Sequence, residues 1–413
     1  MQPISTQHHR PKRKLPDSLA GIVAFEALEP HLDRLHDAYA HGNRKLHFDN
    51  FLVAYLLAFY NASIRSLRTI ELLAHDHRFA HHFQGSTLKK SPFSDAGATF
   101  NAELLGPLIQ QLYAQAPDLR HVDPKLRTLI EKLHIFDGSM FNVASDVAWA
   151  IAHRTRDGKR HARVRIDFCL RVIDDTVASL KVSGRDRGSE AASFIDQIQP
   201  GQIYIVDRNF IHFGFLNAAL NTGSDFVLRI RDNAPSMKVI EDLAIEPDDL
   251  AAGIVADQLV QLTGSAGAPD PPSQTLRLLS IIDDKGQSIQ LLTSLTNDPS
   301  SEANLPARLI AQIYRWRWQI ELFFRWLKVF AGLDHLISHH PNGITIQFYV
   351  AVIGMLLIYI KTGRKPDKYS LILLQQVAAG SSMESLLPWL QRRWREKDLA
   401  SARRARQAAA KKA

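Results

Sequence analysis

The stretch IYIV, residues 203–206, is wholly apolar and is followed at once by Asp207. A short strand without polar residues is typical of the centre of a sheet that is covered on both faces. Upstream, LHIFDGS, residues 133–139, is a second apolar strand that runs into Asp137. We expect the two strands to be neighbours at the centre of one sheet, where an unpaired carboxylate would be costly.

Strands and helices alternate around these two strands. Residues 163–172 alternate apolar and polar side chains, and residues 176–184 return as a further strand after a turn. A helix capped by Ser189 comes next, and the helix after the apolar strand is closed by Gly223. A last strand follows at residues 225–231. This order predicts an α/β fold with a mixed five-stranded sheet flanked by helices.

The rest of the chain divides by composition into further segments. The N-terminal helical region could read DNA ends or serve only for packing. The predicted segments are a basic disordered tail at 1–14, a helical domain at 15–125, the α/β core at 130–231 and 296–340, a β-rich insertion at 232–295, C-terminal helices at 341–395 and a basic tail at 396–413.

Charge and composition restrict the class of protein. The chain has 413 residues with 46% hydrophobic content, which excludes a wholly disordered protein. A net charge of +8 favours a phosphate-rich partner. Both tails are strongly basic, and they are either solvated ends or non-specific phosphate contacts.

Cysteine content and apolar runs bear on the compartment. The single cysteine, Cys169, excludes an intramolecular disulfide and suits a reducing cytoplasm. The longest apolar run, residues 348–360, is shorter than the roughly 20 residues that a bilayer span needs, so we expect a buried helix and no membrane partner. The polar N-terminus does not have the pattern of a secretory signal.

The stretch YRWRWQIELFFRWLK, residues 314–328, carries an unusual group of charges. A helix with about 100° per residue places on one face Tyr314, Glu321, Arg325 and Lys328, with Arg317 about 60° to one side. An aromatic and aliphatic stripe lies opposite. One interpretation is a solvated face on which Arg317 and Glu321 pair four residues apart. The other is a site that Glu321 completes with the two strand carboxylates.

Three converging carboxylates predict a metal site. Asp137, Asp207 and Glu321 would repel one another unless a cation held them. Oxygen ligands without sulfur or histidine select Mg²⁺ or Mn²⁺. Two such ions about 3.5–4 Å apart can activate an attacking oxygen and stabilise the leaving oxygen of a phosphodiester. The flanking bases would hold DNA phosphates, Arg317 bidentately and Lys328 as a point charge.

Three motifs carry a resemblance to a known family. FDGS at 136–139, IVDRNF at 205–210 and Y-x2-R-x3-E-x6-K at 314–328 resemble the catalytic motifs of bacterial insertion-sequence transposases of the DDE type. The YREK signature and the strand-rich insertion before the glutamate are similar to those of insertion sequence family four. This resemblance implies an RNase H-like catalytic core.

The same resemblance implies roles for individual residues. It makes Asp137, Asp207 and Glu321 the catalytic metal ligands, and it assigns DNA contacts to Tyr314, Arg317 and Lys328, with Arg208 as a further candidate and Arg325 added by its place on the charged face. The implied reaction frees a 3′-hydroxyl at the end of the element and joins it to target DNA. Double-stranded DNA would be the partner, at the terminal repeats and at the target, and a homodimer would hold two ends together.

Several alternatives stay open at this stage. Relatives can use a hairpin intermediate with a tryptophan from the insertion, but residues 232–295 contain no tryptophan here. The chain could be a DNA-binding transposition inhibitor or domesticated remnant without catalysis, or an RNase H-like nuclease without strand transfer. A zinc site in HDHRFAHH, residues 75–82, is disfavoured because cysteine is missing there.

Overall fold

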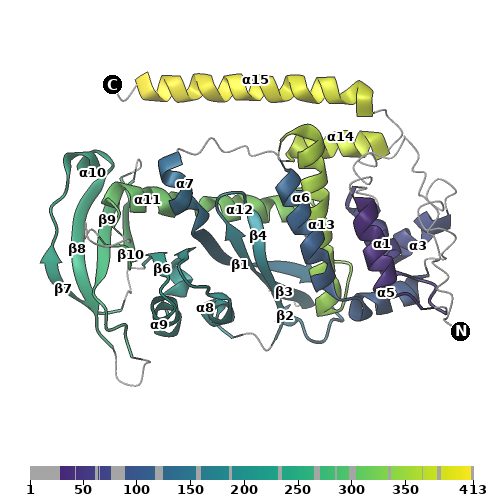
Figure 1. The fold of residues 1–413 in the computed structure, drawn as a ribbon, viewed down its shortest axis with the longest axis horizontal. Coiled ribbons are helices and arrows are strands. Elements are labelled where there is room, and N and C mark those ends of the chain that lie inside the picture. Colours follow the sequence, from purple (N-terminus) through teal and green to yellow (C-terminus); the bar gives the residue numbers. More distant parts are fainter. Residues whose placement is uncertain are drawn as a thin grey trace, which may run out of the picture. The chain divides into compact units, whose positions relative to one another are not determined.

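The structure is a computed structural model of the full chain (Figure 1). It describes residues 28–41, 43–60, 64, 66–75, 89–116, 124–154, 160–185, 188–230, 235–264, 270–283, 286–296, 304–333, 336–364, 366–378 and 383–410. The predicted tail at 1–14 and all but the first residue of the HDHRFAHH stretch lie outside these ranges.

The chain forms two compact units. The first, here called the sheet unit, is Arg120–Arg325, and the second, the helical unit, joins Met1–Leu119 with Trp326–Ala413. The N-terminal helices therefore share a unit with the C-terminal helices, although more than 200 residues lie between them in the sequence. The finer domain boundaries stay a prediction.

One mixed sheet organises the sheet unit (Figure 1). Its ten strands in the described part of the chain are β1 Leu133–Val143, β2 Ile151–Arg154, β3 Arg160–Arg171, β4 Thr176–Ser183, β5 Ile203–Val206, β6 Asp225–Arg229, β7 Met237–Asp242, β8 Ile254–Leu262, β9 Leu276–Ile282 and β10 Ser288–Thr293. Its helices are α7 Pro124–Glu131, α8 Glu190–Phe194, η4 Ile195–Gln197, η5 Arg208–Phe210, α9 Phe213–Asn221, α10 Pro247–Ala251, α11 Ala307–Arg315 and α12 Trp318–Arg325.

The predicted strands and the mixed α/β class are confirmed. The order along the sheet is β2-β3-β1-β5-β6-β10-β9-β8-β7, with β4 paired to β3. Strand β1 runs parallel to β5, and β5 parallel to β6, while β3 is antiparallel to β1. Strand β2 was not predicted, because four residues with a basic end show too little alternation to be recognised.

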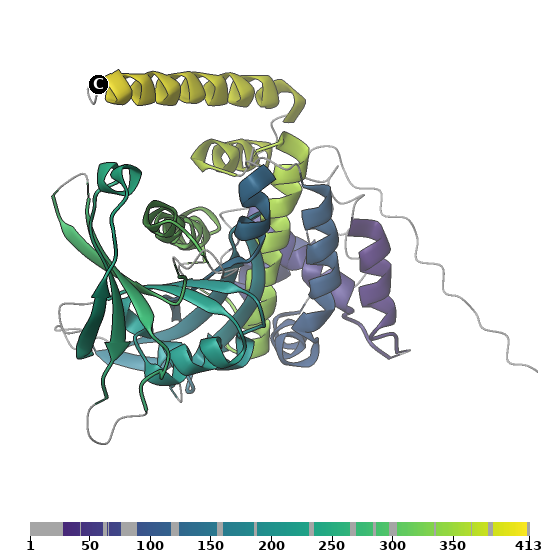
Figure 2. The ribbon, with the colours of Figure 1, turned by 60° about the vertical axis from the view of Figure 1, so that its left-hand side comes forward.

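The sheet is wider than the predicted five strands. Strand β10 pairs antiparallel with β6, and β9, β8 and β7 follow in antiparallel order. Figure 2 shows these green strands as a continuation of the sheet. The physical reason is that β6 would otherwise expose a row of unpaired backbone groups, which the strands of the predicted insertion satisfy.

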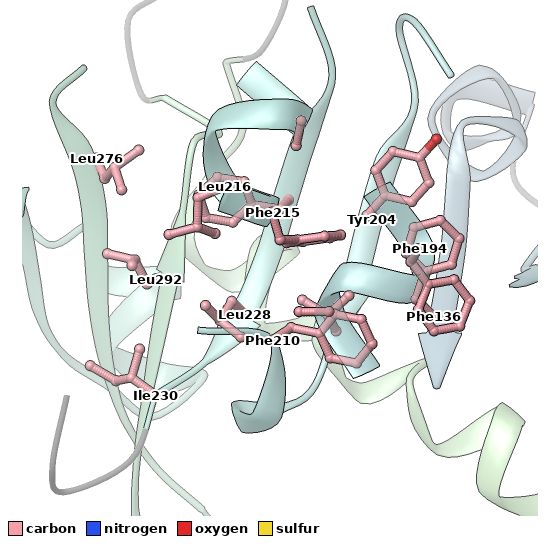
Figure 3. Close-up of a cluster of buried hydrophobic side chains, with 14 of the residues drawn as sticks. Phe136, Phe194, Tyr204, Phe210, Phe215, Leu216, Leu228, Ile230, Leu276 and Leu292 are labelled. Atoms are coloured by element: carbon pink, nitrogen blue, oxygen red, sulfur yellow. The ribbon is translucent and has the colours of Figure 1, made fainter. Parts of the chain in front are cut away.

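An aromatic core fills one face of the central strands (Figure 3). Phe136 of β1 stacks on Phe194 of α8 at 4.3 Å and on Tyr204 of β5 at 4.5 Å. On the opposite face, Phe168 of β3 meets Phe323 of α12 edge-on, with ring centroids 5.5 Å apart. Helices α8 and α12 therefore cover different faces of the sheet, as the wholly apolar central strand requires.

The helical unit is built around one long apolar helix. Its described helices are α1 Glu29–Asp37, α2 Phe48–Tyr60, α3 Leu67–His75, α5 Lys90–Thr99, η3 Ala102–Leu105, α6 Gly106–Gln115, a π-helix at Trp326–Phe330, α13 Pro341–Thr362, α14 Lys368–Ala378 and α15 Met383–Ala410. Helix α13 contacts α2, α5 and α6. A Cβ at Gly354 would lie 2.5 Å from the Phe59 ring, so this close packing of α13 on α2 requires glycine.

Two segments of the helical unit bear on earlier expectations. By length and composition, residues Pro341–Ile360 could cross a membrane, but 83% of the apolar window is buried inside the protein, as expected of a core helix. The basic tail predicted at 396–413 is helical up to Ala410, where α15 ends, and its role stays a prediction. Alanine and arginine are strong helix formers, which accounts for a helix here.

Candidate active site

The two strand aspartates lie side by side because their strands are in register. In the parallel pair β1 and β5, Ile135 lies opposite Ile205. Two residues further along, the same register places Asp137 beside Asp207, on one face of neighbouring strands about 4.8 Å apart. Asp207 also accepts a hydrogen bond from the backbone N–H of Asn209 at 2.6 Å, which fixes the turn after β5. This brings together the first two predicted carboxylates.

A third strand adds a cation to this row, which sequence reasoning missed. Val206 of β5 lies opposite Leu228 of β6, so Arg229 follows beside Asp207. The sequence did contain a signal for Arg229, because this residue directly follows the apolar run FVL at residues 226–228. Arg229 ends β6 and is half-buried, and its positive charge lies on the same face as the two aspartates.

Arg317 connects the sheet to the predicted glutamate. Its Nη2 donates to Glu321 Oε1 at 3.0 Å, and its Nη1 lies 3.6 Å from Asp137 Oδ2. Only 18% of the Arg317 side chain and 16% of the Asp137 side chain are exposed. The predicted pairing four residues apart is therefore present, with Arg317 largely buried against Asp137 and the Glu321 side chain partly exposed.

Tyr314 lies in the same group. The Arg317 guanidinium carbon is 5.9 Å from the centroid of the Tyr314 ring. Burial raises the pKa of Tyr314, and the nearby charges of Arg317 and Arg229 partly offset that rise. The tyrosine thus stays protonated and can donate a hydrogen bond in this positively charged surrounding.

The segment 314–328 is not the single helix that was predicted. Helix α11 ends at Arg315, a turn holds residues 316 and 317, and α12 ends at Arg325 before a π-helix begins. At the turn, Arg317 N–H donates to the Tyr314 carbonyl at 3.0 Å, three residues back. Bulky side chains favour an α-helix only weakly, so a tighter turn can interrupt it here. In a turn with three residues per turn, each residue advances by about 120° around the helix axis and not by about 100°. The simple projection therefore misplaces residues across the turn.

Three further residues were predicted to bind DNA. Arg208 and Arg325 are exposed, on η5 and α12 respectively. Lys328 lies in the π-helix, which belongs to the helical unit. Their roles stay predictions.

Asp137 carries the clearest electrostatic perturbation of the site. Burial, together with the negative charges of Glu190 and Asp207, raises the pKa of Asp137 to about 8. Arg317 and the N–H of Gly138 oppose this rise. A cation placed beside these carboxylates would therefore gain a favourable interaction that Arg317 alone does not supply in full.

Glu190 is a second residue that sequence reasoning missed. It is the first residue of α8, after the Ser189 cap, where an acidic residue is ordinary. Burial raises the pKa of Glu190, and the charges of Asp207 and Asp167 add to the rise. No sequence pattern linked this glutamate to the site, because its place depends on how α8 packs on the sheet.

The donor set fits a hard divalent cation. Asp137, Asp207 and Glu321 offer only carboxylate oxygens, which are the ligands that Mg²⁺ and Mn²⁺ prefer. In the part of the chain that the structure describes, no group of three or more such side chains is already arranged to hold an ion. The Glu321 side chain is 42% exposed and paired with Arg317, so it has room to change rotamer.

Comparison with known proteins agrees with these features. Residues 131–357, more than half of the chain, match the family model described as Transposase DDE domain. The chain belongs to this family. The match confirms the resemblance read from the three motifs and includes every residue of the site discussed above.

Curated relatives of this DDE-family chain are themselves named as transposases. It is 29% identical over 230 residues, 55% of the chain, to "Putative transposase y4zB" of Sinorhizobium fredii. It is 36% identical over 69 residues, 17% of the chain, to "Putative transposase for insertion sequence element IS4SA" of Synechocystis sp.. It is 24% identical over 264 residues, 62% of the chain, to "Probable transposase for insertion sequence element IS5377" of Geobacillus stearothermophilus. These matches span 60%, 20% and 64% of the relatives' own lengths.

A solved structure of a piggyBac transposase synaptic complex with hairpin DNA was also found. It shares 10% identity with this DDE-family chain, with a TM-score of 0.39, and the match covers 93% of this chain and 85% of that one.

Proposed function

We propose that the chain is a DNA transposase that cleaves phosphodiester bonds at the ends of an insertion sequence and joins the freed 3′-hydroxyls to target DNA. The observation that carries this proposal is the single guanidinium of Arg317, which contacts both Asp137 and Glu321, while Asp207 directly follows the neighbouring strand β5. The strand order β4-β3-β1-β5-β6 supports an RNase H-like core. The YREK pattern supports membership of insertion sequence family four.

The three carboxylates would hold Mg²⁺ or Mn²⁺. When bound, such ions activate the attacking oxygen and stabilise the leaving oxygen of the phosphodiester. Asp137 and Asp207 are set by the register of their strands, and Glu321 by α12. Because burial and like charges raise the pKa of Asp137, this side chain can also hold a proton near neutral pH when no cation is present.

The neighbouring bases would orient the DNA. Arg317 carries five N–H donors and uses few of them within the protein, so others can reach phosphate oxygens. Arg229 adds a positive charge on the same face, and Tyr314 a neutral donor. Arg208, Arg325 and Lys328 would contact the backbone more peripherally.

The assembly and the location of the protein are part of the same proposal. Terminal repeats and target DNA would be the partners, and a homodimer would hold two ends of the element together. The net charge of +8 supports a DNA partner, and the cytoplasm at the nucleoid is the compartment in which the substrate lies.

The substitution Glu321→Gln tests the proposal. It keeps the size of the side chain but removes a charged ligand, so we expect the affinity for end-containing DNA to survive and Mg²⁺-dependent cleavage to fall by about three orders of magnitude or more. Glu131→Gln, an exposed glutamate at the end of α7, is the matched control and should cleave normally. Unchanged cleavage by Glu321→Gln would remove this residue from the site.

The unmodified protein in the same assay separates the alternatives. DNA binding without nicking would identify a transposition inhibitor or an inactive remnant. Nicking without joining of the 3′-hydroxyl to target DNA would identify a nuclease without strand transfer.

A further inference from the structure

Glu190 has an unusual position for a residue in the first turn of a helix. Its Oε1 is fully buried and has no hydrogen-bond partner of its own among the residues that the structure describes, because the nearby Gly138 N–H, which lowers the pKa of Glu190, donates to Asp137 Oδ1 at 2.8 Å. Burying a carboxylate oxygen without a partner costs free energy, and acidic residues at helix starts ordinarily remain in water. The fold therefore holds this oxygen in a place that helix stability alone does not explain.

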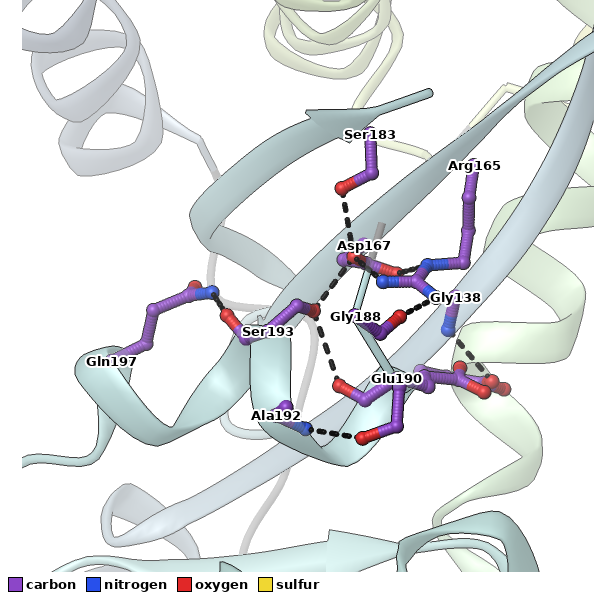
Figure 4. A network of polar contacts seen from close by, with 11 residues as sticks. Gly138, Arg165, Asp167, Ser183, Gly188, Glu190, Ala192, Ser193 and Gln197 are labelled. Carbon is purple, nitrogen blue, oxygen red and sulfur yellow. Dashed lines mark hydrogen bonds and ion pairs between the residues drawn. The ribbon is translucent and has the colours of Figure 1, made fainter. Parts of the chain in front are cut away.

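The Glu190 carboxylate lies against the backbone next to Asp137. A Cβ at Gly138 would be 2.7 Å from Glu190 Oε1 and 3.3 Å from its Cδ. Only a glycine directly after Asp137 leaves room for the carboxylate at this point. Figure 4 shows Glu190 beside Gly138 at the start of α8.

The ends of the strands let this carboxylate approach the site from the other face. Strand β5 ends at Val206, whereas β1 continues to Val143. Beyond Asp207, β1 is therefore without β5 as its neighbour. Glu190 comes to this edge from α8, which packs on the face opposite to α12. The charges of Glu190, Asp137 and Asp207 all act on one another.

A neighbouring carboxylate shows what a purely structural acid looks like here. Asp167 accepts from Arg165 Nε at 2.7 Å and Nη2 at 2.9 Å, and from Ser193 Oγ at 2.7 Å (Figure 4). The remaining Arg165 nitrogen, Nη1, donates to the Gly188 carbonyl at 3.1 Å. Arg165 is thus engaged elsewhere and does not serve as the partner of Glu190 Oε1.

We propose that Glu190 is a fourth carboxylate of the metal centre, which helps Asp137 and Asp207 to hold a divalent cation from the face of the sheet opposite to Glu321. A divalent cation supplies the partner that the buried oxygen lacks. This inference rests on the proposed function only in that a cation binds at Asp137 and Asp207.

If Glu190 served only the stability of α8, the substitution Glu190→Gln would change the melting temperature of the metal-free protein in the opposite direction. If Glu190 only complemented the positive N-terminus of α8, its neutralisation would lower the stability of the metal-free protein. In the proposed role, Glu190→Gln removes repulsion from a crowded acidic group, so the metal-free melting temperature rises. The stabilisation that Mn²⁺ gives to the unmodified protein is then reduced.

The experiment uses the full chain, freed of metal with a chelator. Mn²⁺ is titrated, free Mn²⁺ is followed by electron paramagnetic resonance, and the melting temperature is recorded at each concentration. For Glu190→Gln we expect at least a tenfold loss of Mn²⁺ affinity and a higher metal-free melting temperature. Asp196→Asn, an exposed acid in η4, is the matched control and should behave as the unmodified protein.

The outcomes separate this inference from the proposed function. Unchanged Mn²⁺ affinity in Glu190→Gln, with a lower metal-free melting temperature, overturns the inference and leaves a helix-terminal role. If the unmodified protein cleaves end DNA and Glu321→Gln does not, the proposed function stands in that case. If the unmodified protein neither binds Mn²⁺ nor cleaves DNA in Mg²⁺, both fall together.

Discussion

At the scale of single residues, Asp137 links stability to pH. Its folded pKa of about 8 lies above the ordinary value of 3.8, so the folded state binds more protons between these two values. The contribution of Asp137 to stability is therefore fully present below about pH 4 and is lost as the pH rises toward 8. The proposed metal binding requires the charged form, so such a site would be maintained at a cost to the stability of the metal-free fold.

We predict that Asp137→Asn stabilises the metal-free protein at pH 7 by on the order of 2–4 kcal/mol, because each pKa unit corresponds to about 1.4 kcal/mol. Denaturant unfolding with a chelator present, from pH 4 to pH 8.5, measures the effect. The difference from the unmodified protein should grow with pH. Asp146→Asn, an exposed aspartate, is the control. A difference that does not vary with pH would contradict the assignment.

Gly138 makes a second residue-scale prediction. A Cβ there would lie 2.6 Å from Asp167 Oδ1, and Arg165 holds this carboxylate in place through Nε at Oδ1 and Nη2 at Oδ2. We expect Gly138→Ala to destabilise the protein by about 1–3 kcal/mol, as overpacking does. Gly106→Ala, where nothing lies within 4 Å of the new Cβ, should be neutral or slightly stabilising. Thermal unfolding measures the change in stability of both variants. An equal change in the two would argue against crowding at Gly138.

The site residues that could be predicted from the sequence are those whose position depends on the local sequence pattern. Asp137 and Asp207 could be paired because each follows an apolar run of residues, and parallel neighbouring strands place such positions at one level. Glu190 could not be found, because its role depends on the packing of α8 and on the end of β5. The pairing of Arg317 with Glu321 followed from their spacing, but its burial against Asp137 did not.

At the scale of elements, the segment around α11 and α12 shows where pattern reasoning fails. In the stripe predicted opposite the charged face, Ile320, Phe323 and Leu327 are buried as expected, whereas Trp316 is only half-buried. The sequence did not reveal the turn at residues 316 and 317. The same composition suits an α-helix, which bonds to the fourth preceding residue, and a tighter turn, which bonds to the third. The number of strands in the sheet was also underestimated, because an apolar stretch that predicts a strand does not show which other strand it pairs with.

A buried ion pair joins two strands of the β-rich insertion. Arg277 donates to Asp257 Oδ1 at 2.8 Å and to Oδ2 at 2.6 Å, and the two side chains are 3% and 4% exposed. Removing one partner leaves the other charge buried and alone. We predict that Arg277→Met costs about 3–5 kcal/mol, and that adding Asp257→Leu recovers most of the loss. A double-mutant cycle by denaturant unfolding tests this, and purely additive losses would contradict it.

At the scale of the whole molecule, the net charge of +8 would favour the encounter with the proposed DNA partner. Exposed arginines on α15, at 403, 404 and 406, belong to the helical unit and not to the carboxylate site. They are placed to contribute to non-specific phosphate binding, the role that the sequence left open for the basic C-terminal segment.

We predict that replacing these three arginines with glutamine weakens non-specific DNA binding and flattens its dependence on salt. Each lost phosphate contact lowers the slope of log K against log salt by about 0.9, so up to about 2.7 in total is expected. Fluorescence anisotropy with random duplex DNA, from 50 to 300 mM salt as the working range, measures the slope. Cleavage at saturating end DNA should be unchanged, because the carboxylates are untouched. An unaltered slope would place the DNA path away from α15, and lost cleavage would show that α15 serves the site itself.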